Sequence, residues 1–169
     1  MKLDMNFYSQ SALEVAPQLI GKLLVRKLDD GTIIKYRITE TEIYYGEEDS
    51  ACHARFGKTN RSKILYEQGG ISYVYLCYGI HYLFNVVTGP KDHPEAVLIR
   101  TVEGYNGPGK LAKALAITKE LNGIDLSTSD KLWIEDDNYK ASYIADKRVG
   151  IDYATDHYKN IKWRYILKE

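Results

Sequence analysis

One stretch, SYVYLCYGIHYLFNVVTG from Ser72 to Gly89, constrains the fold more than any other part of the chain. It is dense in β-branched and aromatic residues, which favour strands. The run can turn only at its centre, where Gly79 follows Tyr78, because glycine accepts the backbone conformations that tight turns need. We therefore expect a β-hairpin with strands near 71–77 and 82–88 and with Tyr78 at its tip.

The polar groups inside this run need partners. Each buried tyrosine ring brings a hydroxyl, and Asn85 places a lone amide between Leu83 and Val87. Buried polar atoms are almost always hydrogen-bonded. For Asn85, a bond to neighbouring backbone and a contact with a bound ligand are equally open. Tyr73 and Tyr82 are expected to pack without a further role.

Apolar periodicity and turn residues predict the other elements. A helix capped by Ser9 or Ser11 should run through position 19, with a break at Pro17 and an end at Gly21. Another helix should run from Gly107 to position 120. The remaining expectations are strands at 22–27, 32–41, 96–102, 132–134 and 163–167, a loop with one helical turn at 46–57, and an ambiguous segment at 60–65.

These elements predict an α+β fold. We expect a single domain over residues 1–169, with a curved, largely antiparallel sheet, flanking helices and a protruding β-hairpin. The length suffices for one sizeable core.

Charge, hydropathy and cysteine content limit the binding partners and the cellular compartment that we expect. The formal net charge is zero, which argues against bulk attraction to nucleic acid or acidic membranes but leaves room for a basic face. No apolar run could span a membrane, and the first residues lack the pattern of a secretory signal. Two cysteines, Cys52 and Cys77, have no zinc-like spacing, and free thiols are favoured over a disulfide. A cytoplasmic protein is expected.

The segment ITETEIY, 38–44, is the most suggestive for chemistry. On a strand, Glu40, Glu42 and Tyr44 share one face. A glutamate there lies at a solvated edge or in a site, and a buried one needs a cation or hydrogen-bond donors to stay ionised. Arg100, at the end of the apolar run AVLIR, is a candidate for that cation.

Two glycine–cation pairs are weaker signals. Gly109 precedes Lys110 at a predicted helix start, and Gly150 lies close to Arg148. Such a helix start can hold a phosphate, although neither segment is a Walker loop. By itself, each pair is better explained by ordinary structure, and His53 alone is better explained as a solvated loop histidine or a capping group.

Taken together and in order, these segments resemble the alkyladenine (3-methyladenine) DNA glycosylases. The segments are APQLIGKLLV, TETEIY, His53, YVYLCYGIHYLFNVVTG, AVLIR, GPGKLAKAL and RVGI, so the resemblance covers nearly the whole chain. It implies a monofunctional enzyme of base-excision repair that hydrolyses the N-glycosidic bond of alkylated or deaminated purines flipped out of double-stranded DNA. No cofactor or metal is implied, and a monomer is expected.

The resemblance also implies roles for single residues. The catalytic glutamate matches Glu42, its partner arginine matches Arg100, and the backbone at Val149 contacts the water that they hold. The flipped base would lie between Tyr44, His53 and Tyr75, with Asn85 excluding guanine, and Tyr78 would replace the flipped nucleotide. The positions expected near DNA phosphates are Gly109, Lys110 and Gly150.

Elementary chemistry agrees with this interpretation. Cleavage of the N-glycosidic bond builds positive charge on the sugar, which a carboxylate stabilises while it orients and deprotonates water. Aromatic faces recover part of the cost of flipping a base. Two alternatives stay open: a carbohydrate-active hydrolase that uses Glu40 and Glu42 as its acid and base, and a non-catalytic nucleic-acid-binding module.

Overall fold

The structure is a computed structural model that describes residues 1–168. Its strands are β1 (Leu23–Lys27), β2 (Ile33–Tyr45), β3 (Ser72–Cys77), β4 (His81–Val87), β5 (Glu95–Val102), β6 (Leu132–Glu135), β7 (Ser142–Asp146) and β8 (Arg164–Lys168). Its α-helices are α1 (Met5–Tyr8), α2 (Ala12–Leu19), α3 (Pro108–Ala114) and α4 (Asp156–Asn160). Three short 3₁₀ helices are η1 (His53–Phe56), η2 (Ser62–Tyr66) and η3 (Lys119–Leu121).

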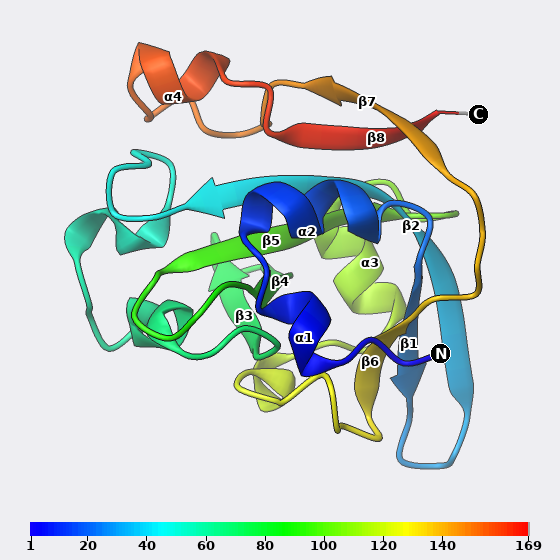
Figure 1. The fold of residues 1–169 in the computed structure, drawn as a ribbon. Helices are drawn as coiled ribbons and strands as arrows, with labels where there is room; N and C mark the ends of the chain where they lie inside the picture. Colours follow the sequence, from blue (N-terminus) through cyan, green and yellow to red (C-terminus); the bar gives the residue numbers. More distant parts are fainter. Residues whose placement is uncertain (169) are drawn as a thin grey trace.

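The strands form one antiparallel sheet around the long strand β2. The main order is β3-β4-β5-β2-β1-β6, and β8 also pairs with β2 and carries β7 on its far side. The β7–β8 hairpin and α4 lie together at the top of Figure 1, where the C-terminal part of the chain packs against the end of β2. The predicted α+β fold with a largely antiparallel sheet is confirmed.

The core lies on one face of this sheet. Helices α2 and α3 pack there against apolar side chains of β2, β4 and β5, including Ile43, Phe84 and Ile99. Thr41 points to the same face, where its hydroxyl donates a 2.9 Å hydrogen bond to the Ala16 carbonyl of α2. Because strand side chains alternate, the neighbouring Glu42 points to the opposite face.

The predicted hairpin is present as β3 and β4, with Tyr78, Gly79 and Ile80 between the strands. Tyr78 and Gly79 have φ angles of 54° and 67°, and the Ile80 N–H donates to the Cys77 carbonyl over 3.1 Å. Positive φ at both central positions is what a type I′ turn requires. The expected turn around Gly31, the cap at Ser11 and the helical turn at 46–57 are confirmed too.

One predicted boundary is wrong, and one expected irregularity is absent. Helix α2 runs through Leu19 as predicted, without the break expected at Pro17, because the proline removes only its own N–H donor to the carbonyl four residues before it. The helix that begins at Gly107 ends at Ala114 rather than at position 120, because Ala116 adopts a φ of 51°. There the Ile117 N–H donates to the Ala112 carbonyl and the Ala116 N–H to the Lys113 carbonyl, as in a Schellman motif.

Other elements differ in extent or were missed. Strand β2 extends through Tyr45, beyond the predicted strand at 32–41, and most of η2 lies in the ambiguous segment at 60–65. The missed elements are α1, β7 and α4. Their short length and exposed residues give little periodicity to read. Cys52 and Cys77 are free thiols, as expected.

Candidate active site

A single row of paired residues crosses five strands on the face opposite the core. Tyr73 pairs with Asn85, Asn85 with Leu98, Leu98 with Glu42, and Glu42 with Arg164. Residues that are directly opposite in neighbouring strands project to the same side of a sheet. The register therefore brings the predicted carboxylate and the predicted pocket amide to one surface.

This surface forms the floor of a cavity of about 640 Å³. Every site residue predicted from the sequence lines it: Glu42, Tyr44, His53, Tyr75, Tyr78, Asn85, Arg100, Gly109, Lys110, Val149 and Gly150. Of the described residues in its lining, Glu42 is the only carboxylate. The structure thus brings these residues together, while their individual roles stay predictions.

Glu42 is fully buried, and both of its carboxylate oxygens have donors. The Tyr44 hydroxyl donates to Oε1 over 3.0 Å, and the Val149 N–H donates to Oε2 over 2.7 Å. Burial raises the pKa of the Glu42 carboxyl above its usual value, whereas the Val149 N–H, the Arg100 guanidinium and the Tyr44 hydroxyl lower it. The result is a fixed carboxylate with a raised proton affinity, suited to accept a proton from water.

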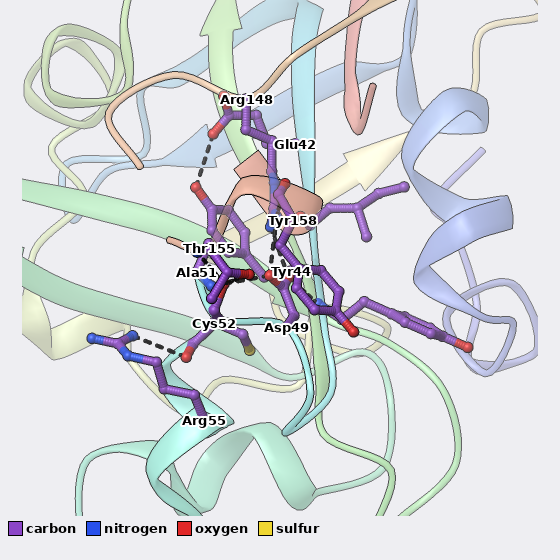
Figure 2. Close-up of polar contacts among 12 residues, drawn as sticks. Glu42, Tyr44, Asp49, Ala51, Cys52, Arg55, Arg148, Thr155 and Tyr158 are labelled. Carbon is purple, nitrogen blue, oxygen red and sulfur yellow. Dashed lines mark hydrogen bonds and ion pairs between the residues drawn. The ribbon is translucent and has the colours of Figure 1, made fainter. Parts of the chain in front are cut away.

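A buried ion pair positions the Val149 amide. The Arg148 guanidinium donates to Asp49 through both Nη atoms, over 2.7 and 3.0 Å, and the two side chains have no exposed surface. Arg148 also donates to the carbonyls of Ile43 and Tyr158, over 2.9 and 3.1 Å (Figure 2). With its side chain held by four hydrogen bonds to three residues, Arg148 places the next residue, Val149, against Glu42.

Arg100 reaches the cavity from an irregularity in the sheet. Glu40 pairs with Thr101 and Thr41 pairs with Ile99, so Arg100 between them has no partner on β2. Such a bulge redirects a side chain and is frequent beside active sites. The ion pair of Arg100 is with Glu40, at 3.9 Å between Nε and Oε1.

The expected Arg100–Glu42 pair is therefore not a direct one. Among residues 1–168, the contacts of Arg100 within ion-pair distance do not include Glu42. The guanidinium still lowers the Glu42 pKa through its charge. Arg100 and Glu42 both line the cavity, so a water molecule that both groups contact would lie in the cavity.

Aromatic rings form one wall of the cavity. The His53 ring lies 4.6 Å from that of Tyr75, and its Nδ1 lies 2.7 Å from the Tyr73 hydroxyl. Burial, and then the charges of Arg61 and Arg55, lower the pKa of His53 to about 4. His53 is thus neutral at physiological pH, and with Nδ1 engaged by Tyr73 its Nε2 can face a ligand.

Asn85 is hydrogen-bonded to neighbouring backbone and also lines the cavity. Its Nδ2 donates to the Tyr73 carbonyl over 3.2 Å, which is the neighbouring-backbone bond that the sequence left open. The side chain is nearly buried, at 4% exposure. The bond holds the amide in one orientation at the floor of the cavity.

The hairpin tip forms part of the cavity mouth. Tyr78 is 90% exposed and Ile80 is 72% exposed, so two large apolar side chains face solvent at the tip. A positive φ is rare for an aromatic residue and persists where the surrounding turn imposes it. An apolar tip of this kind is suited to enter a groove or to contact a stacked base.

The rim beside the hairpin comes from the start of α3 and from the segment after Arg148. Gly109 packs so closely on the His81 ring that a Cβ atom there would lie 2.8 Å from it. Lys110 and Gly150 are exposed beside the opening. The rim therefore offers a lysine ammonium and glycine backbone to an anion outside the cavity.

Three residues that line or support the cavity were missed from the sequence. Tyr73, expected only to pack, bonds to His53, and the guanidinium carbon of Arg61 lies 5.0 Å from the Tyr75 ring. Asp49, the buried partner of Arg148, follows Glu47 and Glu48 in the chain and gives no separate signal in the sequence. Their residue types are common on ordinary surfaces, so only the fold reveals these contacts.

Comparisons with known proteins identify the family. The family described as "Methylpurine-DNA glycosylase (MPG)" matches residues 6–106 and 103–169. The chain belongs to this family. It is therefore a DNA glycosylase, a hydrolase of N-glycosyl bonds, as the sequence motifs indicated.

Relatives match over the whole length. A protein of Natranaerobius thermophilus named "Putative 3-methyladenine DNA glycosylase" is 44% identical, over 100% of this chain and 96% of that protein. Proteins with the same name from Borreliella burgdorferi and Methanocella arvoryzae are 44% and 40% identical, over 99% and 98% of this chain and 96% and 92% of the relatives.

Two further observations concern the described residues only. None of the helices within residues 1–168 has the length and apolar character that a bilayer crossing requires. Within the same residues, no three His, Cys, Asp or Glu side chains gather as metal ligands would.

Proposed function

We propose that this glycosylase excises alkylated and deaminated purines, 3-methyladenine and hypoxanthine among them, from double-stranded DNA. The reaction is hydrolysis of the N-glycosidic bond by a water that Glu42 activates. One observation carries the proposal: Glu42 is a buried carboxylate with a donor on each oxygen, at the floor of an aromatic-walled cavity. The relatives' name supports the substrate class.

In this mechanism, the Tyr44 hydroxyl and the Val149 N–H hold the Glu42 carboxylate in one direction. As the glycosidic bond breaks, the sugar becomes positively charged, and the nearby carboxylate stabilises it. The base leaves with the electron pair of the glycosidic bond. Water on the Arg100 side of Glu42 gives one proton to the carboxylate as its oxygen bonds to the sugar carbon. Glu42 activates water directly, and Lys110 serves at the rim as a phosphate contact, so the mechanism needs no Schiff base and the enzyme is monofunctional.

The cavity walls recognise the flipped base. The rings of Tyr44, Tyr75 and His53 provide stacking faces, each worth roughly 1–3 kcal/mol per stacked base. Neutral His53 offers its second ring nitrogen, Nε2, as a hydrogen-bonding partner for the base, and phenol faces attract the positive charge of an alkylated purine. Asn85 lies where the amino group of guanine would enter.

DNA binds across the cavity mouth. Tyr78, at the exposed tip of the hairpin, fills the space of the flipped nucleotide, and Gly109, Lys110 and Gly150 contact phosphates at the rim. Arg55 and Arg61 add positive charge to the same cavity, so its surroundings are basic although the whole chain is neutral. One monomer carries every group that this mechanism uses.

The carbohydrate-active alternative fits the structure less well. Glu40 does not line the cavity with Glu42 but is bound by Arg164 at 2.7 Å between Nη1 and Oε1. An acid and base pair must reach the same bond from within one site. The two glutamates lie on the same face of β2 but in different surroundings.

The test uses four duplexes with 3-methyladenine, hypoxanthine, ethenoadenine or 7-methylguanine at one position. The parent protein should release base and leave an abasic site from at least one of them. The Glu42→Gln variant should bind the same duplex and release nothing measurable. Folded parent protein that leaves no abasic site in any of the four would overturn the proposal.

A further inference from the structure

The side chain of Glu40 joins three segments that carry the site. Its Oε1 accepts from the Arg164 guanidinium over 2.7 Å and lies 3.9 Å from Arg100 Nε. Its Oε2 accepts from the Thr101 hydroxyl over 2.6 Å. The carboxylate is largely buried, with 13% of its side chain exposed. Burial of a carboxylate is costly, so Glu40, two residues before Glu42, is expected to have a role at this position.

The first segment is the bulge that carries Arg100. Arg100 has no ladder partner on β2, and its Nε is buried without a hydrogen bond. A guanidinium that leaves a bulge is free to take several directions unless a charge restrains it. Glu40 supplies that charge from the strand position opposite Thr101.

The second segment is the start of α3. The Thr101 hydroxyl donates its one hydrogen bond to Glu40, and it accepts a 3.2 Å hydrogen bond from the Gly107 N–H. Glu40 is thereby linked through one hydroxyl to the helix start that forms the cavity rim.

The third segment leads to Val149. Arg164, held by Glu40, donates from Nε to the Lys147 carbonyl over 2.7 Å. Lys147 lies two positions before Val149, whose N–H donates to Glu42. The Asp146 carboxylate is a second, more exposed partner of Arg164, at 3.4 Å.

We propose that Glu40 is a positioning residue for the glycosylase reaction: through Arg100 and Arg164 it holds the guanidinium and the Val149 amide in place around Glu42. The proposal rests on the proposed function. Glu40 does not touch the substrate; its charge sets the geometry of groups that do. A misplacement of the reacting groups by about 1 Å can lower the rate by roughly 10²-fold.

The test compares Glu40→Gln with its parent. Glutamine keeps the shape and the acceptor for Thr101 but removes the charge that holds the two arginines. We expect single-turnover excision to fall roughly tenfold or more. The affinity for a duplex with an abasic-site analogue should stay within about twofold of that of the parent. The melting temperature should equal that of the parent within measurement error. A loss in affinity as large as the loss in rate, or a clear fall in the melting temperature, would show a merely structural role.

Three comparisons sharpen the result. Arg164→Lys keeps the charge but loses the bond to the Lys147 carbonyl, so it should slow excision as well. In the Glu40→Gln/Arg164→Lys double variant, the rate should equal that of the slower single variant, because the two residues act as one unit. Asp146→Asn, the matched control, removes the other ion pair of Arg164 and should leave the rate unchanged.

A readout independent of catalysis completes the design. In ¹H–¹⁵N spectra of the free protein, Glu40→Gln should shift the Val149 amide resonance, and Asp146→Asn should not. Parental rates in Glu40→Gln, or independent effects in the double variant, would overturn the role of Glu40 alone. A parent protein without any excision would instead overturn the proposed function, and the positioning role with it.

Discussion

The backbone N–H of Val149 donates a 2.7 Å hydrogen bond to Oε2 of Glu42, although 107 positions separate the two residues. The amide belongs to a segment that the buried Arg148–Asp49 pair anchors. A backbone donor cannot rotate away as a side chain can, so the direction of the carboxylate depends on the fold itself. This contact links the stability of the domain to the chemistry of its site.

Replacing Glu42 with glutamine should abolish most excision and retain DNA binding. Gln keeps the size of the side chain but cannot accept a proton from water, and a positioned general base contributes roughly 10²–10⁴-fold. The measurement is single-turnover release of hypoxanthine from a duplex, beside the affinity for the same duplex. Glu103→Gln, an exposed carboxylate after β5, is the control. Parental activity in Glu42→Gln would remove Glu42 from the mechanism.

As the pH is lowered, the rate of excision should begin to fall at a higher pH than the ordinary pKa of glutamate would predict. Burial raises the pKa of Glu42, and only the ionised form accepts a proton, so the rate rises as the pH rises through that pKa. His53, with a pKa of about 4, stays neutral from about pH 5 to 8 and adds no second limb there. A pH–rate profile of single turnovers on hypoxanthine tests this. A flat profile down to the usual glutamate range would contradict the raised pKa.

The main features of the site follow from local patterns in the sequence. Alternation placed Glu42 and Tyr44 on one face, and Gly79 beside Tyr78 located the hairpin tip. Both depend on neighbours in the chain, so a single sequence suffices to derive them. The order of motifs then indicated which distant segments meet, and the cavity lining agrees.

What could not be predicted depends on contacts between distant residues or on exceptions to local rules. Helix α3 ends at a left-handed Ala116, where the usual glycine signal is absent. The bulge at Arg100 leaves no mark in the run AVLIR, yet it directs the guanidinium towards Glu40. Asp49 lies 99 positions from Arg148, and nothing local distinguishes it from the acidic residues beside it.

Replacing Asp49 with asparagine should destabilise the domain and slow excision together. The change leaves the Arg148 guanidinium buried without its counter-charge, which costs about 3–5 kcal/mol when one partner of a buried pair is removed. Val149, the next residue, then loses its support against Glu42. Thermal unfolding and single-turnover excision below the melting temperature are the measurements.

The control for Asp49 is an exposed pair. Asp156 lies 4.0 Å from Lys159 with 96% of its side chain exposed, so Asp156→Asn should leave the melting temperature unchanged. An Asp49→Asn protein that melts with the parent would show that the buried pair does not hold this segment.

Replacing Tyr78 with alanine should weaken base flipping and leave the fold intact. The ring is 90% exposed, so its removal takes little from the core, and alanine has no less freedom at a φ of 54° than tyrosine. Loss of one aromatic stacking partner, worth roughly 1–3 kcal/mol, should reduce the flipped population about tenfold. Fluorescence of 2-aminopurine beside the lesion reports flipping, with Tyr139→Ala, another exposed tyrosine, as control. Unchanged fluorescence and excision would show that Tyr78 is not the wedge.

Replacing Asn85 with serine should relax the exclusion of guanine. The amide of Asn85 is held by the Tyr73 carbonyl at the cavity floor, and serine has a smaller side chain without the amide group, so the guanine amino group gains room. Release of undamaged guanine should rise about tenfold or more relative to that of hypoxanthine, since such small steric differences discriminate roughly 10–200-fold. Asn122→Ser offers the matched control, because Asn122 accepts from the Val74 N–H and does not line the cavity. Guanine release as low as that of the parent, from a variant that still excises hypoxanthine, would exclude Asn85 as the filter.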